Sequence, residues 1–367
     1  MLNMTLDEIA KLPTLKDVVN HYIAGERKIE NRVRNTIFEA VFPTCALKGL
    51  YQPVLMHDGK HILLPLSPAQ HSYYRGESDN HAECYPSLYR KGMSEADIFV
   101  ERVKRCEMER MMQEYPITDL FANSIHAKAP DGAWHKLRFR IGFDGMAQHY
   151  GIKTEFMDMT LDPWIAAFFA ATEYDFSNDT YTAITDTTKH PYGTFYLYNE
   201  IPIPFRNSER IDVVGMQPLL RPGRQQAFVF RMQPEENFNS LVSKTYFRHD
   251  ASINKEIVSR FNVENNLFPK ELLGERIRSE IVKGDEFSMG AYNEARHRYA
   301  QGKSDAELKS YMKKGHIRIN TNNRSWFTDV EKKQAVDYWE IYKQELFSKI
   351  RLRWTYIEST DLLNEDR

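Results

Sequence analysis

The sequence predicts an α+β fold, in which a central and mostly antiparallel sheet is flanked by helices and extended by helical regions at both ends. Two observations lead to this prediction. Strand-like segments rich in aromatic residues gather in the middle of the chain, and they follow helices without the regular alternation of a βαβ array. Amphipathic segments with apolar residues three and four positions apart lie toward the two ends.

The composition is that of an ordinary globular protein. Of the 367 residues, 42% are hydrophobic and 27% are charged, and no apolar run reaches the roughly 18 residues of a membrane span. The net charge of −2 excludes a uniformly basic nucleic-acid binder. The start, MLNMTLDEIAKLP, has acidic residues where a secretory signal is positive, so we expect a cytoplasmic, bacterial type of protein.

Several familiar chemical signatures are missing from the sequence. Cys45, Cys84 and Cys106 lie far apart without a CxxC pair, so neither a disulfide framework nor a metal site is expected. The sequence has no GxxxxGK[ST] phosphate loop, no GxSxG nucleophile turn and no HExxH metal motif. A functional site in this chain would therefore consist of residues outside these familiar motifs.

Residues 1–69 are predicted to form a mostly helical extension. Thr5 with Glu8 three positions later forms a capping box, and Gly25 is a candidate end of this helical stretch. A further helix is expected over residues 31–42, because Pro43 follows it. The extension ends in loop or strand material.

In the middle of the chain, an amphipathic helix capped by Ser94 is expected over residues 94–114, and a second helix over residues 134–150. Residues 153–157 suit a short buried strand. Asp162 and Pro163 then open an apolar helix, with the aspartate as N-cap and the proline in the first turn.

Asp158 and Thr160 are predicted to lie between that strand and that helix, where polar site residues are often found. Three further strand-like pieces follow, GTFYLYNEI, RIDVVGMQPLL and QQAFVFRMQ, and Gln225–Gln226 are expected to begin the last of them.

From about Ile253 the pattern turns helical again, and residues 283–285 are the best late boundary. Residues 284–367 are thus a helical, locally basic C-terminal region, with fourteen Lys or Arg against eight Asp or Glu between residues 294 and 353. A solvated helix face and an anionic partner explain this charge equally well.

One short stretch, Tyr74-Arg75-Gly76, ends an aromatic run in a way that has two explanations. Arg75 is either a charge at a strand end that points into solvent, or a fixed cation at a site, with Gly76 admitting a ligand.

Through this stretch and several other motifs, the chain resembles the FRG domain family, which is named for a Phe/Tyr-Arg-Gly motif. The resemblance covers roughly residues 68–283 and implies an FRG domain over residues 70–283. The motifs that carry it are YRGES (74–78), YPSLYR (85–90), AQHYG (147–151), Thr154, Asp158 and Thr160, Pro163 to Ala170, Arg221, Gln225–Gln226 and LFP (267–269). This chain departs from the pattern at Lys153, Glu155, Met159 and Ala227, where the family has proline, arginine, tryptophan and glycine.

A weaker resemblance to ADP-ribosyltransferases implies a split sheet and NAD as a substrate, with no metal. The catalytic residues that it implies are Arg75, His149, Asp158 and Gln226. The NAD-binding residues that it implies are Tyr74, Gly76, Gln148, Tyr150, Thr160 and Gln225. Arg75 would hold the diphosphate, a tyrosine would stack on nicotinamide, and Gln225 or Gln226 would bind the ribose.

This resemblance implies a toxin or phage-defence effector that modifies a protein or nucleic acid and has an antitoxin or regulatory partner. A glutamine cannot act as a base, however, and the RPGRQQ stretch has no glutamate. Glu77 and Glu155 are the carboxylates of other motifs that could replace it.

Two other functions remain open. The chain is alternatively a non-catalytic recognition module in bacterial or phage defence, in which Arg75, His149 and Asp158 hold a polar network together or bind a nucleotide or a phage-derived component. A third alternative is nucleic-acid binding by the basic residues near Trp326 and Phe327; these are Arg318, Arg324, Lys332 and Lys333.

Overall fold

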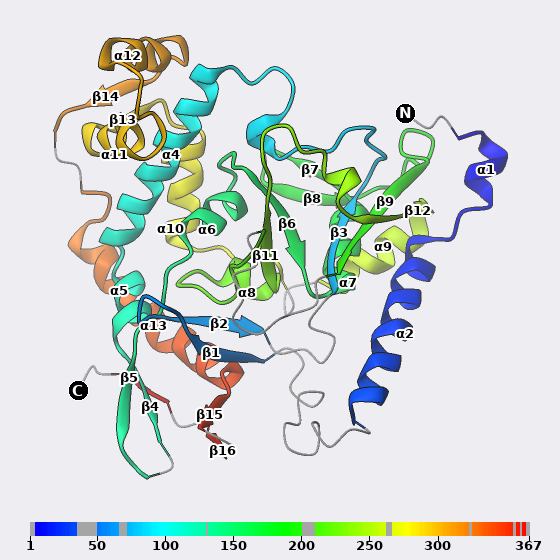
Figure 1. The fold of residues 1–367 in the computed structure, drawn as a ribbon, viewed down its shortest axis with the longest axis horizontal. Helices are drawn as coiled ribbons and strands as arrows, with labels where there is room; N and C mark the ends of the chain where they lie inside the picture. Colours follow the sequence, from blue (N-terminus) through cyan, green and yellow to red (C-terminus); the bar gives the residue numbers. More distant parts are fainter. Residues whose placement is uncertain are drawn as a thin grey trace.

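The structure is a computed structural model. It describes residues 4–34, 50–65, 72–129, 131–199, 210–261, 266–322, 325–354, 357–359 and 362–364. Figure 1 shows a sheet at the centre of the molecule with helices around it, which confirms the predicted α+β class. In the described ranges, no helix is both long and apolar enough to cross a membrane.

In the described residues the central sheet has six strands, and each neighbouring pair is antiparallel. In spatial order the strands are β10 (Ile211–Val213), β11 (Ala227–Arg231), β6 (Phe156–Thr160), β3 (Ser72–Glu77), β9 (Tyr192–Asn199) and β12 (Ser243–Arg248). In the middle of the sheet, β3 pairs with β9 over its whole length, whereas its register with β6 is the single pair Tyr74–Thr160.

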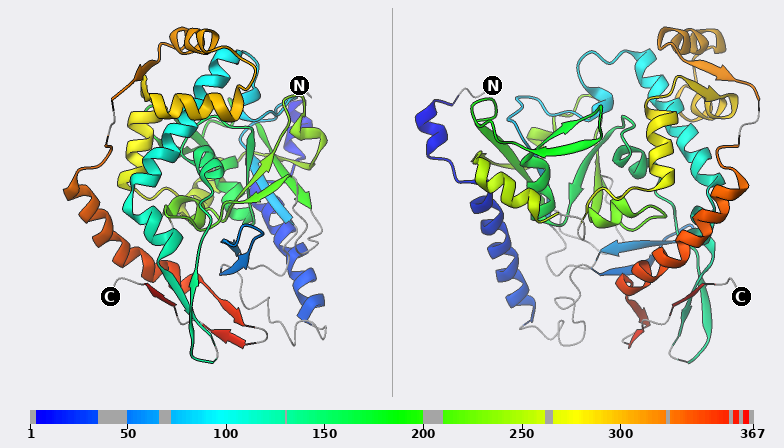
Figure 2. Two further views of the ribbon diagram at one scale, coloured as in Figure 1. Left: turned by 60° about the vertical axis from the view of Figure 1, so that its left-hand side comes forward. Right: turned by 180° about the vertical axis from the view of Figure 1, so that it is seen from behind.

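Helix α7 (Pro163–Ala170) packs on the central strand β3. A Cβ atom on Gly76 would lie only 2.0 Å from the carbonyl oxygen of Ala166, so the close approach of strand and helix requires glycine here. Helices α2 (Leu15–Arg34) and α9 (Ala251–Ser259) lie on the same side of the molecule as α7 (Figures 1 and 2). Leu15, Val18 and Val19 of α2 join the apolar cluster beneath α7.

The largest apolar cluster of the described residues lies further along the same face of the sheet, where α4 (Glu95–Glu114), α6 (Phe143–His149) and α13 (Asp329–Lys349) meet the strands β6 and β11. The remaining helices and turns are α1 (Leu6–Ala10), η2 (Ser87–Tyr89), α5 (Pro116–Asn123), α8 (Leu220–Arg224), η3 (Phe238–Ser240), α10 (Leu272–Arg276), the π-helical turn η4 (Ile277–Val282), α11 (Met289–Tyr299) and α12 (Asp305–Lys314).

The other described strands form five smaller sheets. They are β1 (Tyr51–Leu55) with β2 (His61–Pro65), β4 (Ile125–Lys128) with β5 (Trp134–Leu137) and β17 (Leu362–Asn364), β7 (Thr172–Asp175) with β8 (Thr180–Ala183), β13 (Glu286–Ser288) with β14 (Arg318–Asn320), and β15 (Leu352–Trp354) with β16 (Ile357–Ser359).

The predictions for the N-terminal region are partly confirmed. Thr5 and Glu8 form the expected capping box at the start of α1. Gly25 does not end a helix, because α2 continues through it to Arg34, and a single glycine in a helix costs only about 1 kcal/mol. The helix expected over residues 31–42 lies largely outside the described residues.

In the middle of the chain, the helix capped by Ser94 is confirmed as α4. Gln225 and Gln226 do not begin a strand as predicted, because they lie in the turn after α8 and β11 starts only at Ala227.

The helix expected over residues 134–150 is short, because Trp134–Leu137 forms strand β5 and only Phe143–His149 is helical. The predicted strand begins later than expected, so that Asp158 and Thr160 lie inside β6 and not in a loop after it. Asp162 and Pro163 open α7 as expected, with the Asp162 carboxylate accepting a hydrogen bond from the backbone N–H of Trp164.

The C-terminal region is helical as predicted, and its longest helix is part of the core. Trp339, Tyr342 and Leu346 of α13 are buried. The Tyr342 hydroxyl donates a hydrogen bond of 2.6 Å to the carbonyl oxygen of Gln217, just ahead of α8. Several of its basic residues, such as Lys309, Lys313 and Lys333, are exposed on the outer faces of its helices.

Candidate functional site

Strand β3 sends its side chains alternately to the two faces of the sheet. Tyr74 pairs with Thr160 of β6, so these two residues and Asp158, two positions before Thr160, share one face. Arg75 points to the opposite face. The two residues at the centre of the predicted site, Arg75 and Asp158, thus have their side chains on opposite sides of the sheet.

Arg75 is bound within the protein. Its Nε and Nη2 atoms donate hydrogen bonds to Glu77 Oε1 at 3.0 and 2.5 Å, and its Nη1 donates to the backbone carbonyl of Asp158 at 3.0 Å. Burial alone would raise the pKa of Glu77, but the charge of Arg75 and these bonds lower it overall. The guanidinium thus fastens β3 to β6 where their pairing ends.

On the opposite face, two glutamines hold a histidine and an aspartate. Gln148 Nε2 donates to Asp158 Oδ2 at 3.0 Å, while His149 Nδ1 lies 3.0 Å from Gln225 Oε1. His149 Nε2 lies 3.7 Å from Asp158 Oδ1. Burial lowers the pKa of His149, against the opposing influence of Asp158. We refer to Gln148, His149, Asp158 and Gln225 as the polar network.

Thr160 connects the polar network to the start of α7. Its hydroxyl donates to the backbone carbonyl of Gln225 at 2.8 Å and accepts a hydrogen bond of 3.1 Å from the N–H of Asp162. Because Asp162 caps α7, the position of the helix start depends on this threonine.

The other predicted residues of the site lie in packed surroundings. Tyr74 is buried and its hydroxyl donates to Glu26 at 2.9 Å. The Tyr150 ring has the Arg221 guanidinium 4.8 Å from its centroid, and its hydroxyl donates to Glu271 at 2.9 Å. Tyr74 and Tyr150 thus serve contacts inside the protein, and the space beside Gly76 is filled by α7.

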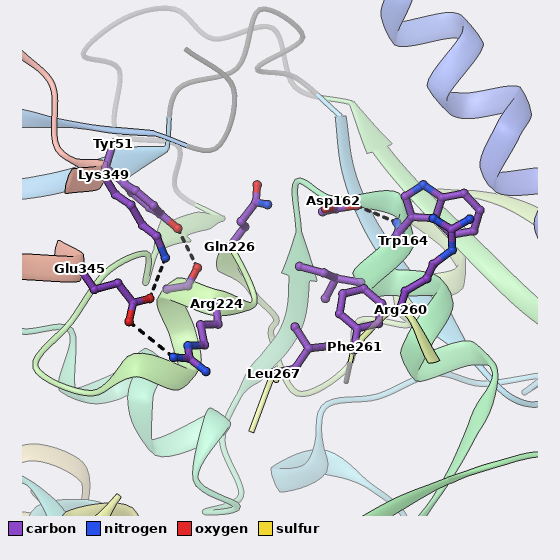
Figure 3. A pocket seen from close by; sticks show the side chains of 12 residues that line it. Tyr51, Asp162, Trp164, Arg224, Gln226, Arg260, Phe261, Leu267, Glu345 and Lys349 are labelled. Atoms are coloured by element: carbon purple, nitrogen blue, oxygen red, sulfur yellow. Dashed lines mark hydrogen bonds and ion pairs between the residues drawn. The ribbon is translucent and has the colours of Figure 1, made fainter. Parts of the chain in front are cut away.

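A cavity of about 650 Å³ lies between α7, α8, α9 and α13 (Figure 3). Its described lining is Tyr51, Asp162, Trp164, Ile165, Gly223, Arg224, Gln226, Arg260, Phe261, Leu267, Glu345 and Lys349. This volume is in the range of small-molecule sites in proteins. Of the ten predicted site residues, the cavity lining includes Gln226.

Gln226 has a strained backbone conformation, with φ of 45°. Left-handed backbone costs a residue with a side chain about 1–2 kcal/mol, and such strain is often found at functional positions. In Figure 3 the Gln226 side chain stands between the groups of α13 and those of α7 and α9. The turn between α8 and β11 therefore presents this amide to the cavity, and Gln225, by contrast, to His149.

Positive charge predominates on the cavity wall. Arg224 and Lys349 both contact Glu345, at 3.5 and 2.8 Å, and the Arg260 guanidinium lies 3.8 Å from the centroid of the Trp164 ring. Three cationic groups thus face two carboxylates, Glu345 and the helix cap Asp162. Such a wall suits a ligand with phosphate groups and an aromatic ring.

The carboxylates considered as replacements for a catalytic glutamate are occupied. Glu77 is paired with Arg75, and buried Glu155 contacts Arg102, Arg105 and Arg231 at 3.2, 3.1 and 3.4 Å. Neither of them lines the cavity.

The basic C-terminal residues do not form the expected stacking surface. Trp326 and Phe327 are buried, and Lys332 is paired with Glu114 at 3.0 Å. Bases cannot stack on buried rings. Arg324 lies outside the described residues.

Sequence reasoning missed most of the cavity residues. Arg224 lies in the RPGRQQ stretch, of which only the two glutamines were predicted as site residues. Trp164 lies in the first turn of the helix that was predicted from Pro163. Tyr51, Arg260 and Lys349 come from distant segments without a motif, so only the folded chain brings them together.

Residues 70–179 match the family model of the FRG domain. The matched part contains Arg75, Gln148, His149, Asp158 and Thr160, whereas Gln225, Gln226 and most of the cavity lining follow it in the chain. A comparison with curated proteins found no match, and a comparison with solved structures found none either. The resemblance to ADP-ribosyltransferases therefore stays a prediction.

Proposed function

We propose that this chain binds a nucleotide in the cavity around Gln226 and that NAD is the first ligand to test. The observation that carries this proposal is the strained Gln226, which reaches into a cavity walled by Arg224, Arg260 and Lys349. Strain of this kind is retained where a side chain is needed in one position.

The lining supplies each group that a nucleotide needs. The guanidinium of Arg224 and the ammonium of Lys349 can bind phosphate oxygens, because both are charged donors on one side of the cavity. The Gln226 amide has both a donor and an acceptor for ribose hydroxyls. Trp164, Phe261 and Tyr51 add aromatic surface, and Arg260 already lies over the Trp164 ring.

The reaction that we propose for bound NAD is the transfer of ADP-ribose to a macromolecule, as in a toxin or defence effector. A nucleophile of the macromolecule would form a bond to the ribose C1′ as the bond to nicotinamide breaks, with neutral nicotinamide leaving and the proton of the nucleophile passing to water. Gln226 would hold the ribose, and fixed dipoles would stabilise the developing charge. A glutamine cannot remove a proton, and Asp162 and Glu345 already have partners on the wall. Binding of NAD is therefore tested first, and transfer of ADP-ribose is tested afterwards.

Isothermal titration of purified protein with NAD and with ADP-ribose tests the binding step. Two variants remove a cavity group: Arg224→Ala, and Gln226→Gly, which keeps the backbone conformation because glycine adopts positive φ without strain. Arg318→Ala is the matched control, since Arg318 is exposed and lies outside the cavity. We expect weaker binding in the two cavity variants only, and unchanged binding in all three would refute the proposal.

A second candidate function is recognition of a ligand without chemistry. The pairing of Arg75 with Glu77 and with the Asp158 carbonyl favours it, because the arginine expected to hold NAD is already used. Nicotinamide release from labelled NAD separates the two candidates. Release that is lost in Gln226→Gly supports transfer, and binding without release supports recognition alone.

A further inference from the structure

Two chains of hydrogen bonds in the polar network run toward each other. In the first, Gln225 Nε2 donates to the carbonyl oxygen of Leu267 at 3.2 Å, so its Oε1 faces His149 Nδ1. An amide oxygen only accepts, and Nδ1 must therefore carry a proton. In a neutral imidazole the other nitrogen, Nε2, is then an acceptor with no proton.

The second chain starts at the backbone of β6. The N–H of Phe156 donates to the Thr154 hydroxyl at 3.2 Å, and this hydroxyl donates to Gln148 Oε1. The amide nitrogen of Gln148 then donates to Asp158 Oδ2. This order leaves the second carboxylate oxygen, Oδ1, as a free acceptor.

Each of the two hydrogen-bond chains ends at an acceptor atom, and these two acceptors face each other. His149 Nε2 and Asp158 Oδ1 lie 3.7 Å apart, and within the described part of the chain both atoms are buried without a hydrogen-bond partner. The His149 side chain is only 5% exposed. Burying two unsatisfied acceptors together is costly, so the site is complete only with a donor between them.

A proton on His149 is one way to supply that donor, and its surroundings oppose it. The Arg221 guanidinium donates to the backbone carbonyl of His149 at 3.0 Å, which places a positive charge next to the ring. Of the charged groups that face His149, Asp158 alone favours the imidazolium, whereas burial and Arg221 disfavour it. Gln225, the remaining contact, carries no charge, and its hydrogen bond to Nδ1 raises the His149 pKa less than burial lowers it.

We propose that the gap between His149 Nε2 and Asp158 Oδ1 binds a neutral –NH₂ group of a ligand, such as a carboxamide or the amino group of a purine. Such a group has two hydrogens and can donate one to each acceptor. With two hydrogen bonds of about 2.9 Å, the acceptors would stand roughly 5 Å apart. To reach this spacing, the Asp158 side chain, which is 36% exposed, must turn outward.

This inference rests in one respect on the proposed function, because NAD carries both a carboxamide and an aminopurine. The test therefore uses smaller probes. Protein with ¹⁵N-labelled histidine is studied by NMR at pH 7.5, with His149→Gln to assign the His149 signals. Without a probe, we expect a proton on Nδ1 and none on Nε2. Nicotinamide and adenosine should shift the Nε2 signal, whereas nicotinic acid and inosine, which lack the –NH₂ group, should not.

Asp158→Asn gives a second and independent readout. The new amide can keep its oxygen on Gln148 and turn its own –NH₂ toward His149 Nε2, which supplies the missing donor from within. We expect its melting temperature to rise by about 2 °C and the response to both probes to disappear. If Asp158 instead forms an ion pair with a protonated His149, the same variant melts at a lower temperature.

Three results would overturn the inference: a proton on Nε2 in the wild type, a lower melting temperature of Asp158→Asn, or no response to nicotinamide and adenosine. If the proposed function fails and this inference holds, the experiments give a different result. In that case NAD does not bind in the cavity, while the small probes still shift the His149 signal.

Discussion

The Tyr150 hydroxyl donates a hydrogen bond of 2.9 Å to Glu271, which also accepts the backbone N–H of Leu220 at 2.8 Å. This one carboxylate joins the end of α6, the start of α8 and the start of α10. Burial raises its pKa to about 7, although its hydrogen bonds act in the opposite direction.

The stability of the protein should consequently fall as pH rises through this range. The Glu271 pKa is higher in the folded protein than in the unfolded chain, so its contribution is fully present below about pH 4.5 and is lost by about pH 8. The loss is up to about 3 kcal/mol. Urea unfolding at pH 5 and pH 8.5 measures it, and Glu271→Gln should flatten the difference. An equal slope in Glu271→Gln and in the exposed control Glu83→Gln would contradict this assignment.

Gly76→Ala should destabilise the protein by about 3 kcal/mol or more. The added methyl group would lie 2.0 Å from the Ala166 carbonyl and 2.7 Å from the Ala170 side chain, so β3 and α7 must separate. Gly25→Ala is the matched control, since a methyl group there meets nothing within 4 Å, and we expect it to stabilise α2 by up to about 1 kcal/mol. Urea unfolding of both variants gives the comparison, and similar effects would refute the packing role of Gly76.

Arg75→Ala should act on stability. The substitution leaves Glu77, 20% exposed, without its partner, and frees the Asp158 carbonyl, for an expected loss of about 2–4 kcal/mol. Adding Glu77→Ala should recover part of that loss, because no unpaired carboxylate then remains. Titration of the Arg75→Ala variant with NAD should give nearly wild-type affinity. A large loss of affinity in folded protein would restore Arg75 as a ligand contact.

Glu345→Gln should increase the affinity of the cavity for anionic ligands. The carboxylate neutralises both Arg224 and Lys349, and a phosphate group must compete with it. We expect ADP-ribose to bind about five- to tenfold more tightly, with the gain decreasing at high salt. Glu340→Gln, five residues earlier on α13 and half exposed, is the control for a change in net charge. Weaker binding by Glu345→Gln would contradict this role of the carboxylate.

The sequence was most informative where local chemistry decides the structure. The capping box of Thr5 with Glu8 and the helix start at Asp162–Pro163 depend on neighbouring residues, and both were predicted correctly. The strand Trp134–Leu137 was not predicted, because its own residue pattern does not indicate a strand. Its extended conformation depends on pairing with β4.

For the candidate site too, the sequence indicated local motifs but not the contacts that only the folded chain creates. AQHYG and the β6 motif indicated Gln148, His149 and Asp158, which do meet in the folded chain. Motif order could not reveal that the sheet separates the Arg75 side chain from them, because that depends on the register of Tyr74 with Thr160. It also could not identify a cavity wall whose residues come from β1, α7, α8, α9 and α13.

The most direct test of the central claim is the affinity of NAD for the wild type and for Gln226→Gly, measured by isothermal titration under identical salt conditions. We expect NAD to bind the wild type and the folded variant to bind NAD at least tenfold more weakly, because the amide that reaches into the cavity is gone. Absence of NAD binding to the wild type, or equal affinity in the two proteins, would contradict the claim.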